Sequence, residues 1–389
     1  MATVRKRSWQ SGDEIRTAWV ADYFDQDGRR HIKTCRTKKE ADSFLVHARH
    51  EIARGVHTPE STSITVAEAA RLWLEKGELE HLERATLRQY RNHVRLHINP
   101  LIGSVKLARL STPAIEGFRD ALLKSGSRVM ARKMLTSLKS IIGEAQRRGL
   151  VAQNAAQPVK VDVKKRDQKK LVVGRDIPSK EDIQTILAQA EGRWRPLFVT
   201  AIFTGTRASE LRGLLWGDVD FTEKVIHVRQ RADQWGAMGA PKSAAGIRTI
   251  PMSPMVVNAL REWRLACPKG NLNLVFPNGR GNVENHANIA SRGFHALQTV
   301  AGLVGADGKP KYGLHALRHF FASWAIERGF SPKRLQALLG HSSIQMTFDV
   351  YGHLFPSLED DHAKFAAGEL ALVGDKGATK SQKINDFNQ

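Results

Sequence analysis

The sequence predicts a multidomain, mainly α-helical protein with small β elements. The chain has 389 residues, more than a single hydrophobic core normally serves. Helical periodicity covers most of it, period-two alternation is confined to short segments, and a lysine-rich polar stretch separates two regions able to form cores. We expect a small β-sheet plus helix (1–57), a helical domain (63–157), a basic linker (158–175), a mixed α+β domain (176–370) and a polar tail (371–389).

Charge is the most unusual bulk property of the chain. Sixty Lys and Arg residues against 39 Asp and Glu give a formal net charge of +21. Such an excess favours polyanionic partners, because each phosphate that a cation neutralises releases condensed counterions. Nucleic acid is therefore the expected partner, and a soluble protein that merely runs basic is the alternative.

The distribution of apolar residues and the cysteine content disfavour several protein classes. No segment approaches the roughly 18 apolar residues of a membrane span, and the N-terminus lacks the apolar middle of a secretory signal. Two cysteines, Cys35 and Cys267, cannot form a disulfide framework or a four-thiolate metal site, and they suit a reducing compartment. We expect a cytoplasmic protein that makes no contact with a membrane.

The N-terminal region should be a small sheet backed by one helix. Residues 19–23 and 30–34 alternate in polarity around an Asp-Gln-Asp-Gly turn, which predicts a β-hairpin. Thr37 and Glu40 have the spacing of a capping box and predict a helix start. Its basic residues either line a sheet that reads a DNA groove or form an ordinary solvated surface; they include Arg29, Arg30 and Lys33.

The second region reads as four or five helices. Capping residues predict helix starts near Thr65 and Thr86, and a further helix should run from about Arg128 to Gly149. One face of the second helix carries four arginines at spacings of four, three and four: Arg84, Arg88, Arg91 and Arg95. Because such a stripe of like charges costs stability on its own, DNA contact is favoured over a solvated face.

The third region contains three short motifs with cationic and hydrogen-bonding residues. Thr204-Gly205-Thr206-Arg207 places Arg207 after a glycine turn at a helix start, where it could present its fork to a phosphate or pair with Glu210. His315 and Arg318 should share a helical face. His341 follows a glycine at a turn, and Tyr351 comes ten residues later.

Together these motifs resemble the tyrosine recombinase (phage integrase) family. The segments TGTRASEL, HALRHFFAS, LLGHSS and VYGH each look like the corresponding family motif, in the family's order. The remaining member of the signature would be Lys242, which in the family sits on the turn of a β-hairpin ahead of an R-x-I-P strand. The resemblance implies that 63–157 is a core-binding domain and 176–370 the catalytic domain. Residues 1–57 resemble the family's arm-binding module less distinctly.

The resemblance also implies a mechanism. Tyr351 would attack a DNA phosphate and form a 3′-phosphotyrosyl bond, so that strands rejoin without ATP. Arg207 and Arg318 would clamp the non-bridging oxygens, and Glu210 would support the arginines. The proton-transfer and hydrogen-bonding roles would fall to His315, His341 and, as general acid for the leaving 5′-oxygen, Lys242. Since three cations supply the positive charge, no metal or other cofactor is expected.

The implied partners are double-stranded DNA attachment sites and three further copies of the chain, because recombination joins two duplexes through four protomers. The extra N-terminal module suggests an integrase of a phage or integrative element, with a DNA-bending protein and an excisionase as plausible accessory partners. A type IB topoisomerase and a non-catalytic DNA-binding regulator are the alternatives. The first shares the tyrosine chemistry, and the second explains the charge but not the six-residue pattern.

Overall fold

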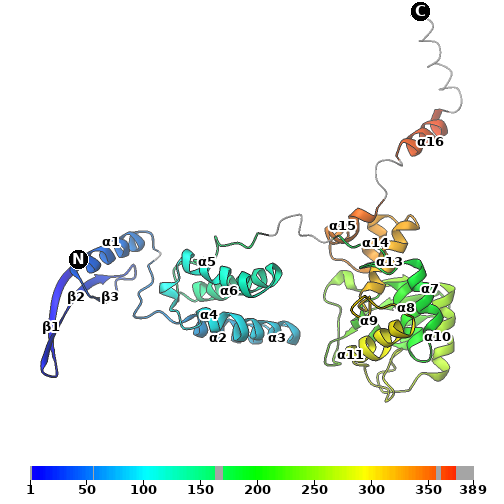
Figure 1. The fold of residues 1–389 in the computed structure, drawn as a ribbon, viewed down its shortest axis with the longest axis horizontal. Helices are drawn as coiled ribbons and strands as arrows, with labels where there is room; N and C mark the ends of the chain where they lie inside the picture. The colour runs from blue at the N-terminus through cyan, green and yellow to red at the C-terminus, as the bar shows by residue number, and fades with distance from the viewer. Residues whose placement is uncertain (1, 56, 163–169, 356–360, 374–389) are drawn as a thin grey trace, which may run out of the picture. The chain divides into compact units, whose positions relative to one another are not determined.

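The computed structural model of the chain describes residues 2–55, 57–162, 170–355 and 361–373. The chain divides into two compact units, Met1–Gln168 and Lys169–Gln389, each of which is described by itself (Figure 1). Among the described residues, no helix has the length and apolar character that crossing a membrane requires. Of the expected basic linker, 158–175, the stretch 163–169 lies outside the described residues, as does most of the expected polar tail, 374–389. At the start of the expected linker, Val159 and Val161 are buried in the core of the first unit, so this part is packed and not an extended linker.

The first unit begins with a three-stranded antiparallel sheet in the order β1-β2-β3, backed by helix α1 (Figure 1). The elements are β1 (Thr3–Ser11), β2 (Glu14–Phe24), β3 (Arg30–Cys35) and α1 (Lys38–Ala53). Tyr23 and Ala21 on one face of β2 pack against Ala41 and Leu45 of α1. The predicted hairpin and the Thr37 cap are therefore confirmed. Strand β1 was not predicted, because its side chains are almost all exposed and its sequence shows no alternation of polar and apolar residues.

Helices form most of the rest of this unit, as far as its residues are described. They are α2 (Val66–Leu79), α3 (Arg84–His93), α4 (Asn99–Ile102), α5 (Thr112–Ser125) and α6 (Arg128–Arg147). The capping box of Thr65 and Glu68 is present, as predicted. Between α3 and α4 the chain makes a π-helical turn, Val94–Ile98, directly before Pro100, which has no N–H to offer a regular helix. The core lies along α6, where Met134, Leu138 and Ile141 are fully buried.

The second unit combines helices with short strands. Its helices are α7 (Lys180–Gln189), α8 (Trp194–Thr204), α9 (Ala208–Arg212), α10 (Pro254–Ala266), α11 (His286–Asn288), α12 (Ala296–Val300), α13 (Ala316–Glu327), α14 (Pro332–Leu339), α15 (Ile344–Tyr351) and α16 (Asp361–Val373). Its strands are β4 (Val219–Asp220), β5 (Val225–Val228), β6 (Arg231–Ala232), β7 (Met238–Gly239) and β8 (Arg248–Pro251). They form one sheet in the order β4-β5-β8 and one hairpin, β6-β7. Helix α16 continues to Val373, three residues past the expected end of the catalytic domain at 370.

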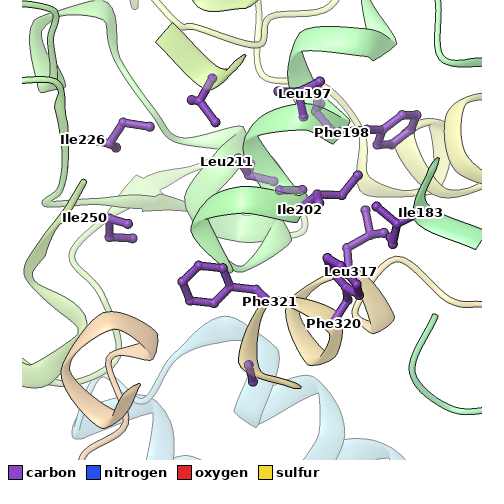
Figure 2. Close-up of a cluster of buried hydrophobic side chains, with 14 of the residues drawn as sticks. Ile183, Leu197, Phe198, Ile202, Leu211, Ile226, Ile250, Leu317, Phe320 and Phe321 are labelled. Atoms are coloured by element: carbon purple, nitrogen blue, oxygen red, sulfur yellow. The ribbon is translucent and has the colours of Figure 1, made fainter. Parts of the chain in front are cut away.

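Helix α8 forms the centre of this unit's core. Figure 2 shows Ile202 of α8 between the sheet residues Ile226 and Ile250 on one side and Leu317 of α13 on the other, whereas Phe198 points away from the sheet. Eight of the eleven residues of α8 are buried, so the helix is apolar around most of its circumference. This packing fixes the C-terminal end of α8 beside α13, and the functional motifs of both helices lie there. The mainly helical, multidomain fold class with small β elements is thereby confirmed.

Candidate active site

Arg207 is positioned by a tight connection between α8 and α9. Gly205 caps α8 in the left-handed conformation (φ 61°), and a Cβ there would lie 2.4 Å from the ring of Phe321. Arg207 follows as the N-cap of α9, where its backbone N–H donates to Glu210 Oε2 at 2.9 Å. Its side chain donates from Nη1 to Glu210 Oε1 at 2.8 Å and from Nη2 to the carbonyl of Gly340 at 3.2 Å. The local pairing that the sequence left open is thus present, with the guanidinium still 35% exposed.

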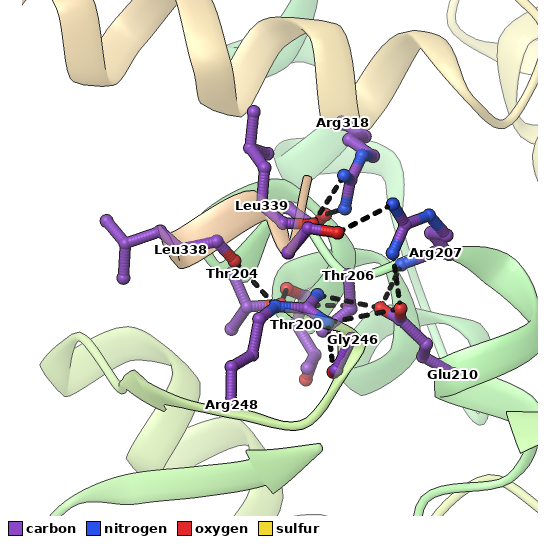
Figure 3. Close-up of polar contacts among 12 residues, drawn as sticks. Thr200, Thr204, Thr206, Arg207, Glu210, Gly246, Arg248, Arg318, Leu338 and Leu339 are labelled. Atoms are coloured by element: carbon purple, nitrogen blue, oxygen red, sulfur yellow. Dashed lines mark hydrogen bonds and ion pairs between the residues drawn. The ribbon is translucent and has the colours of Figure 1, made fainter. Parts of the chain in front are cut away.

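Arg318 lies in the first turn of α13 and is held by the backbone. Its Nη1 donates to the carbonyl of Gly205 and its Nη2 to that of Leu339, both at 2.6 Å (Figure 3). Burial, together with the positive charge of Arg207, lowers the pKa of Arg318 to about 9. The guanidinium therefore remains charged at neutral pH, and two like charges are kept close together, as an anion-binding site requires.

Glu210 joins Arg207 to a further arginine, Arg248 of strand β8. Arg248 donates from Nη2 to Glu210 Oε2 at 2.8 Å and from Nη1 to Oε1 at 3.1 Å (Figure 3). Burial alone raises the pKa of Glu210, but the hydrogen bonds and charges of Arg248 and Arg207 outweigh it and hold this pKa below its usual value. The carboxylate is thus ionised and orients two arginines at once.

Two of the predicted histidines lie near this cluster. His341 follows Gly340, which ends α14 in the left-handed conformation (φ 64°), and its Nδ1 is 2.9 Å from Thr347 Oγ1. Burial and the nearby arginines, Arg318 first, lower the pKa of His341 to about 4. His315 is the N-cap residue of α13, and the packing around its imidazole and the charge of Arg318 lower its pKa, although part of the ring faces solvent. Both rings are therefore neutral at pH 7.

Tyr351 is the last residue of α15 and is 1% exposed. Its ring lies parallel to that of His341 at a centroid distance of 6.4 Å. Burial raises the pKa of Tyr351 to about 12, while the charges of Arg318 and Arg207 act in the opposite direction. Since these charges reach the phenol, its hydroxyl already lies within the field of both arginines.

Lys242 lies in the connection from β7 to β8, after the β6-β7 hairpin and outside its tight turn. Its exposed side chain lines a cavity of about 340 Å³ together with Arg207, Arg231 and Ser342. The resemblance implies a lysine on the turn of a β-hairpin. In the structure Lys242 lies in the long connection between β5 and β8, which pair antiparallel. Lys242 and Arg207 thus line the same cavity.

The predicted DNA-contacting residues of the first unit fall into two groups. On α3, Arg84, Arg88 and Arg91 are exposed, as is Arg95 on the π-helical turn, and Leu87 and Val94 are buried as expected. Arg91 also pairs with Glu78 at 2.5 Å.

The basic residues of the sheet module are less uniform. Arg29 is exposed in the β2-β3 turn, whereas Arg30 donates from Nε to Asp22 Oδ1 at 2.9 Å. Lys33 pairs with Glu60 and lies 5.0 Å from the ring centre of Phe44, on the side of the sheet that α1 covers.

Two further residues contact the site, Arg248 and His319, and the sequence assigned neither of them a catalytic role. Arg248 alternates with buried Ile250 on β8, so a period-two reading of Arg-x-Ile would have placed it inward. His319 is four residues after His315 and so shares its helical face; its Nδ1 is 2.8 Å from the hydroxyl of Tyr351. Within the described part of the chain, no three His, Cys, Asp or Glu side chains are arranged to hold a metal ion.

The chain is similar to known proteins over most of its length. Residues 179–357 match the phage integrase family. The tyrosine recombinase XerC-like protein of Caldanaerobacter subterraneus subsp. tengcongensis is 27% identical over 376 residues, covering 89% of this chain and 94% of that protein. The integrase of Streptomyces ambofaciens is 27% identical over 366 residues, covering 87% of this chain and 90% of its own.

Solved structures share the fold. The Tn1549 transposon integrase in complex with transposon right-end DNA matches with a TM-score of 0.65 and 22% identity, over 79% of this chain and 100% of that one. A lambda integrase tetramer bound to a Holliday junction matches with a TM-score of 0.57 and 18% identity, over 83% and 93%. The candidate site therefore lies within a segment, 179–357, that matches the phage integrase family, and the chain is similar over 89% of its length to a tyrosine recombinase, one of a class of enzymes that exchange DNA strands.

Proposed function

We propose that the chain is a site-specific integrase that cleaves and rejoins DNA through a covalent bond between Tyr351 and a 3′-phosphate. The observation that carries this proposal is the meeting of Arg207, Arg318 and Tyr351. The first two are joined through the backbone of residues 205 and 339–340. Tyr351 contacts the residue that follows each anchor, since its hydroxyl is 2.8 Å from Nδ1 of His319, next to Arg318, and its ring lies parallel to that of His341, next to Gly340. Two fixed guanidinium groups beside a phenol suit in-line attack on a phosphodiester.

In this proposal the arginines bind the two non-bridging oxygens, whose negative charge grows in the transition state. Their donors are preorganised, because each guanidinium is already hydrogen-bonded to the backbone on one side. His341 would hydrogen-bond a non-bridging oxygen, with its ring oriented by Thr347. Lys242, at the cavity that Arg207 also lines, would donate a proton to the leaving 5′-oxygen. His315, at the N-terminal end of α13, would take part in proton transfer around the nucleophile.

DNA would be held by both units. The exposed arginines of α3 would contact the phosphates flanking the crossover site, and the sheet module would bind separate arm sites. Full recombination would take four copies of the chain on two duplexes, with a DNA-bending protein and an excisionase as accessory factors. The likeness to a putative prophage integrase and to the ICEBs1 integrase supports integration and excision of a mobile element as the biological reaction.

Covalent trapping tests the proposal. A nicked suicide substrate carrying the element's attachment site should give a denaturant-resistant protein–DNA band with the wild-type chain and none with Tyr351→Phe. The matched control is Tyr312→Phe, another buried tyrosine of the second unit, which bonds to Asp182 and should still give the band. Both variants should bind the duplex with wild-type affinity. A band from Tyr351→Phe would overturn the proposal. Relaxation of plasmids that lack the site would favour the topoisomerase reading.

A further inference from the structure

The hydroxyl of Tyr351 has a specific partner that the six-residue signature does not include. His319 Nδ1 lies 2.8 Å from it, and the two rings meet at a centroid distance of 5.7 Å and an angle of 63°. This distance is that of a good hydrogen bond. A nucleophile and its base are expected to be related in this way.

The two signature histidines are engaged elsewhere. His341 bonds to Thr347 through Nδ1 and lies parallel to the tyrosine ring rather than pointing at its hydroxyl. His315 meets His319 edge to face, at a centroid distance of 4.8 Å and an angle of 88°. Among the described residues, His319 is thus the histidine in hydrogen-bonding contact with the nucleophile, and His315 packs behind it.

The surroundings keep His319 neutral. Burial first, then His315 and Arg318 of the same helical end, lower the pKa of His319 to about 4, and Asp176, which precedes α7, acts in the opposite direction. At neutral pH the imidazole therefore has an unprotonated ring nitrogen. Tyr351, from α15, keeps its proton, since its own pKa is about 12. The hydroxyl of Tyr351 can therefore donate a hydrogen bond to Nδ1 of the neutral His319 imidazole when Nε2 carries the ring proton.

We infer that His319 is a further catalytic residue, which accepts the proton of Tyr351 during strand cleavage. As the Oη–P bond forms, the O–H bond of Tyr351 breaks and its proton passes to Nδ1 of His319. The P–O5′ bond breaks at the same time, and the leaving oxygen takes a proton from Lys242. In rejoining, the DNA 5′-hydroxyl attacks the phosphorus and passes its proton to the neutral amine of Lys242, while the P–Oη bond breaks and the imidazolium returns its proton to the leaving phenolate. The inference rests on the proposed function and adds a base to it.

Substrates with a sulfur atom at the bridging 5′ position separate the two proton transfers, because a thiolate leaves without a general acid. On ordinary DNA, His319→Ala and Lys242→Ala should each slow cleavage on the order of 10²-fold or more. On the sulfur substrate Lys242→Ala should recover to near the wild-type rate, and His319→Ala should not. Its residual rate should also rise about tenfold per pH unit between pH 7 and 10, as the tyrosinate fraction grows.

A second variant and a control guard against misfolding. His319→Asn retains an acceptor for the hydrogen bond but cannot hold the proton, so it should bind DNA and melt like wild type and still be slow. His227→Ala, which removes a surface histidine of β5 that bonds to Thr249, should cleave at the wild-type rate. Sulfur rescue of His319→Ala, a flat pH profile in that variant, or wild-type rates in His319→Asn would each overturn the inference.

Failure of the inference can be told from failure of the proposed function. If wild type forms no covalent complex, or if Tyr351→Phe forms one, the proposed function fails and His319 is not at issue. If wild type forms the complex and His319→Ala equals or exceeds it at every pH, only the inference fails. The contact would then serve to hold the phenol in its buried position.

Discussion

Glu210 and Arg248 form a two-point ion pair inside the second unit, with side chains only 3% and 6% exposed. Arg248 also donates from Nε to the carbonyl of Leu338 at 2.7 Å and from Nη1 to that of Gly246 at 2.9 Å. One side chain therefore links the helix of Arg207, the loop of Lys242 and the turn before His341. Three motifs that are far apart in the sequence are held together by this one arginine.

Arg248→Met should destabilise the protein strongly, because it leaves the buried carboxylate of Glu210 with one arginine in place of two. Removing one partner of a buried pair costs about 3–5 kcal/mol in the free energy of unfolding. Adding Glu210→Gln to that variant should cost less than it does in the wild-type background. Urea unfolding of the four proteins measures this coupling, and additive effects of the two changes would contradict it.

Gly340→Ala should impair both stability and cleavage. The position has φ 64°, and a Cβ would lie 2.8 Å from the carbonyl of Ala245 and 3.0 Å from Arg248 Nη1. The matched control is Gly329→Ala, at φ 80° with nothing within 4 Å, which pays only the backbone cost of about 1 kcal/mol. Thermal melting and the cleavage rate should both fall further for Gly340→Ala. Equal losses in the two variants would mean that the close approach to Arg248 is unimportant.

The second unit should lose stability as the pH falls from 6.5 towards 4. His341 has a folded-state pKa of about 4 against an unfolded value of about 6.5, so the unfolded chain binds more protons in this window. The full difference corresponds to on the order of 3 kcal/mol for this buried ring. His341→Gln should reduce the loss of melting temperature between pH 7 and pH 5. A pH dependence unchanged by the substitution would show that other groups dominate.

DNA contact by the sheet module should depend on the sheet face turned away from α1. The pairing of Arg7 with Ala18 and of Trp9 with Arg16 places these side chains opposite the face that carries Tyr23 and Ala21. Arg7→Ala and Arg16→Ala should each weaken binding to arm-site DNA and reduce its salt dependence by about one unit of slope. Lys33→Ala is the matched control, because its ammonium pairs with Glu60 on the α1 side. Equal effects of all three would point to a non-specific charge contribution.

Several features of the fold and of the candidate site were predictable from the sequence, because they depend on residues that are close together in the chain. Arg207 at a helix start, His341 behind a left-handed glycine and the caps at Thr37 and Thr65 all follow from spacings of a few residues. The contacts of His319 and Arg248 were not predictable in this way. His319 bonds to a residue 32 positions away, and Arg248 to one 38 positions away, so only the packed fold reveals the partners. Strand β1 was missed for a different reason, since its exposed side chains follow no burial rule.

The anchors of the active-site arginines are carbonyl oxygens of residues 205, 338, 339 and 340. Every amino acid supplies such an oxygen, whatever its side chain. Substitutions at positions 338 and 339 can therefore change the surrounding core without removing the acceptors, provided that the backbone of the turn keeps its conformation. Gly205 and Gly340 allow the left-handed backbone conformation that this path requires. This part of the site therefore depends on the backbone conformation more than on the identity of the side chains.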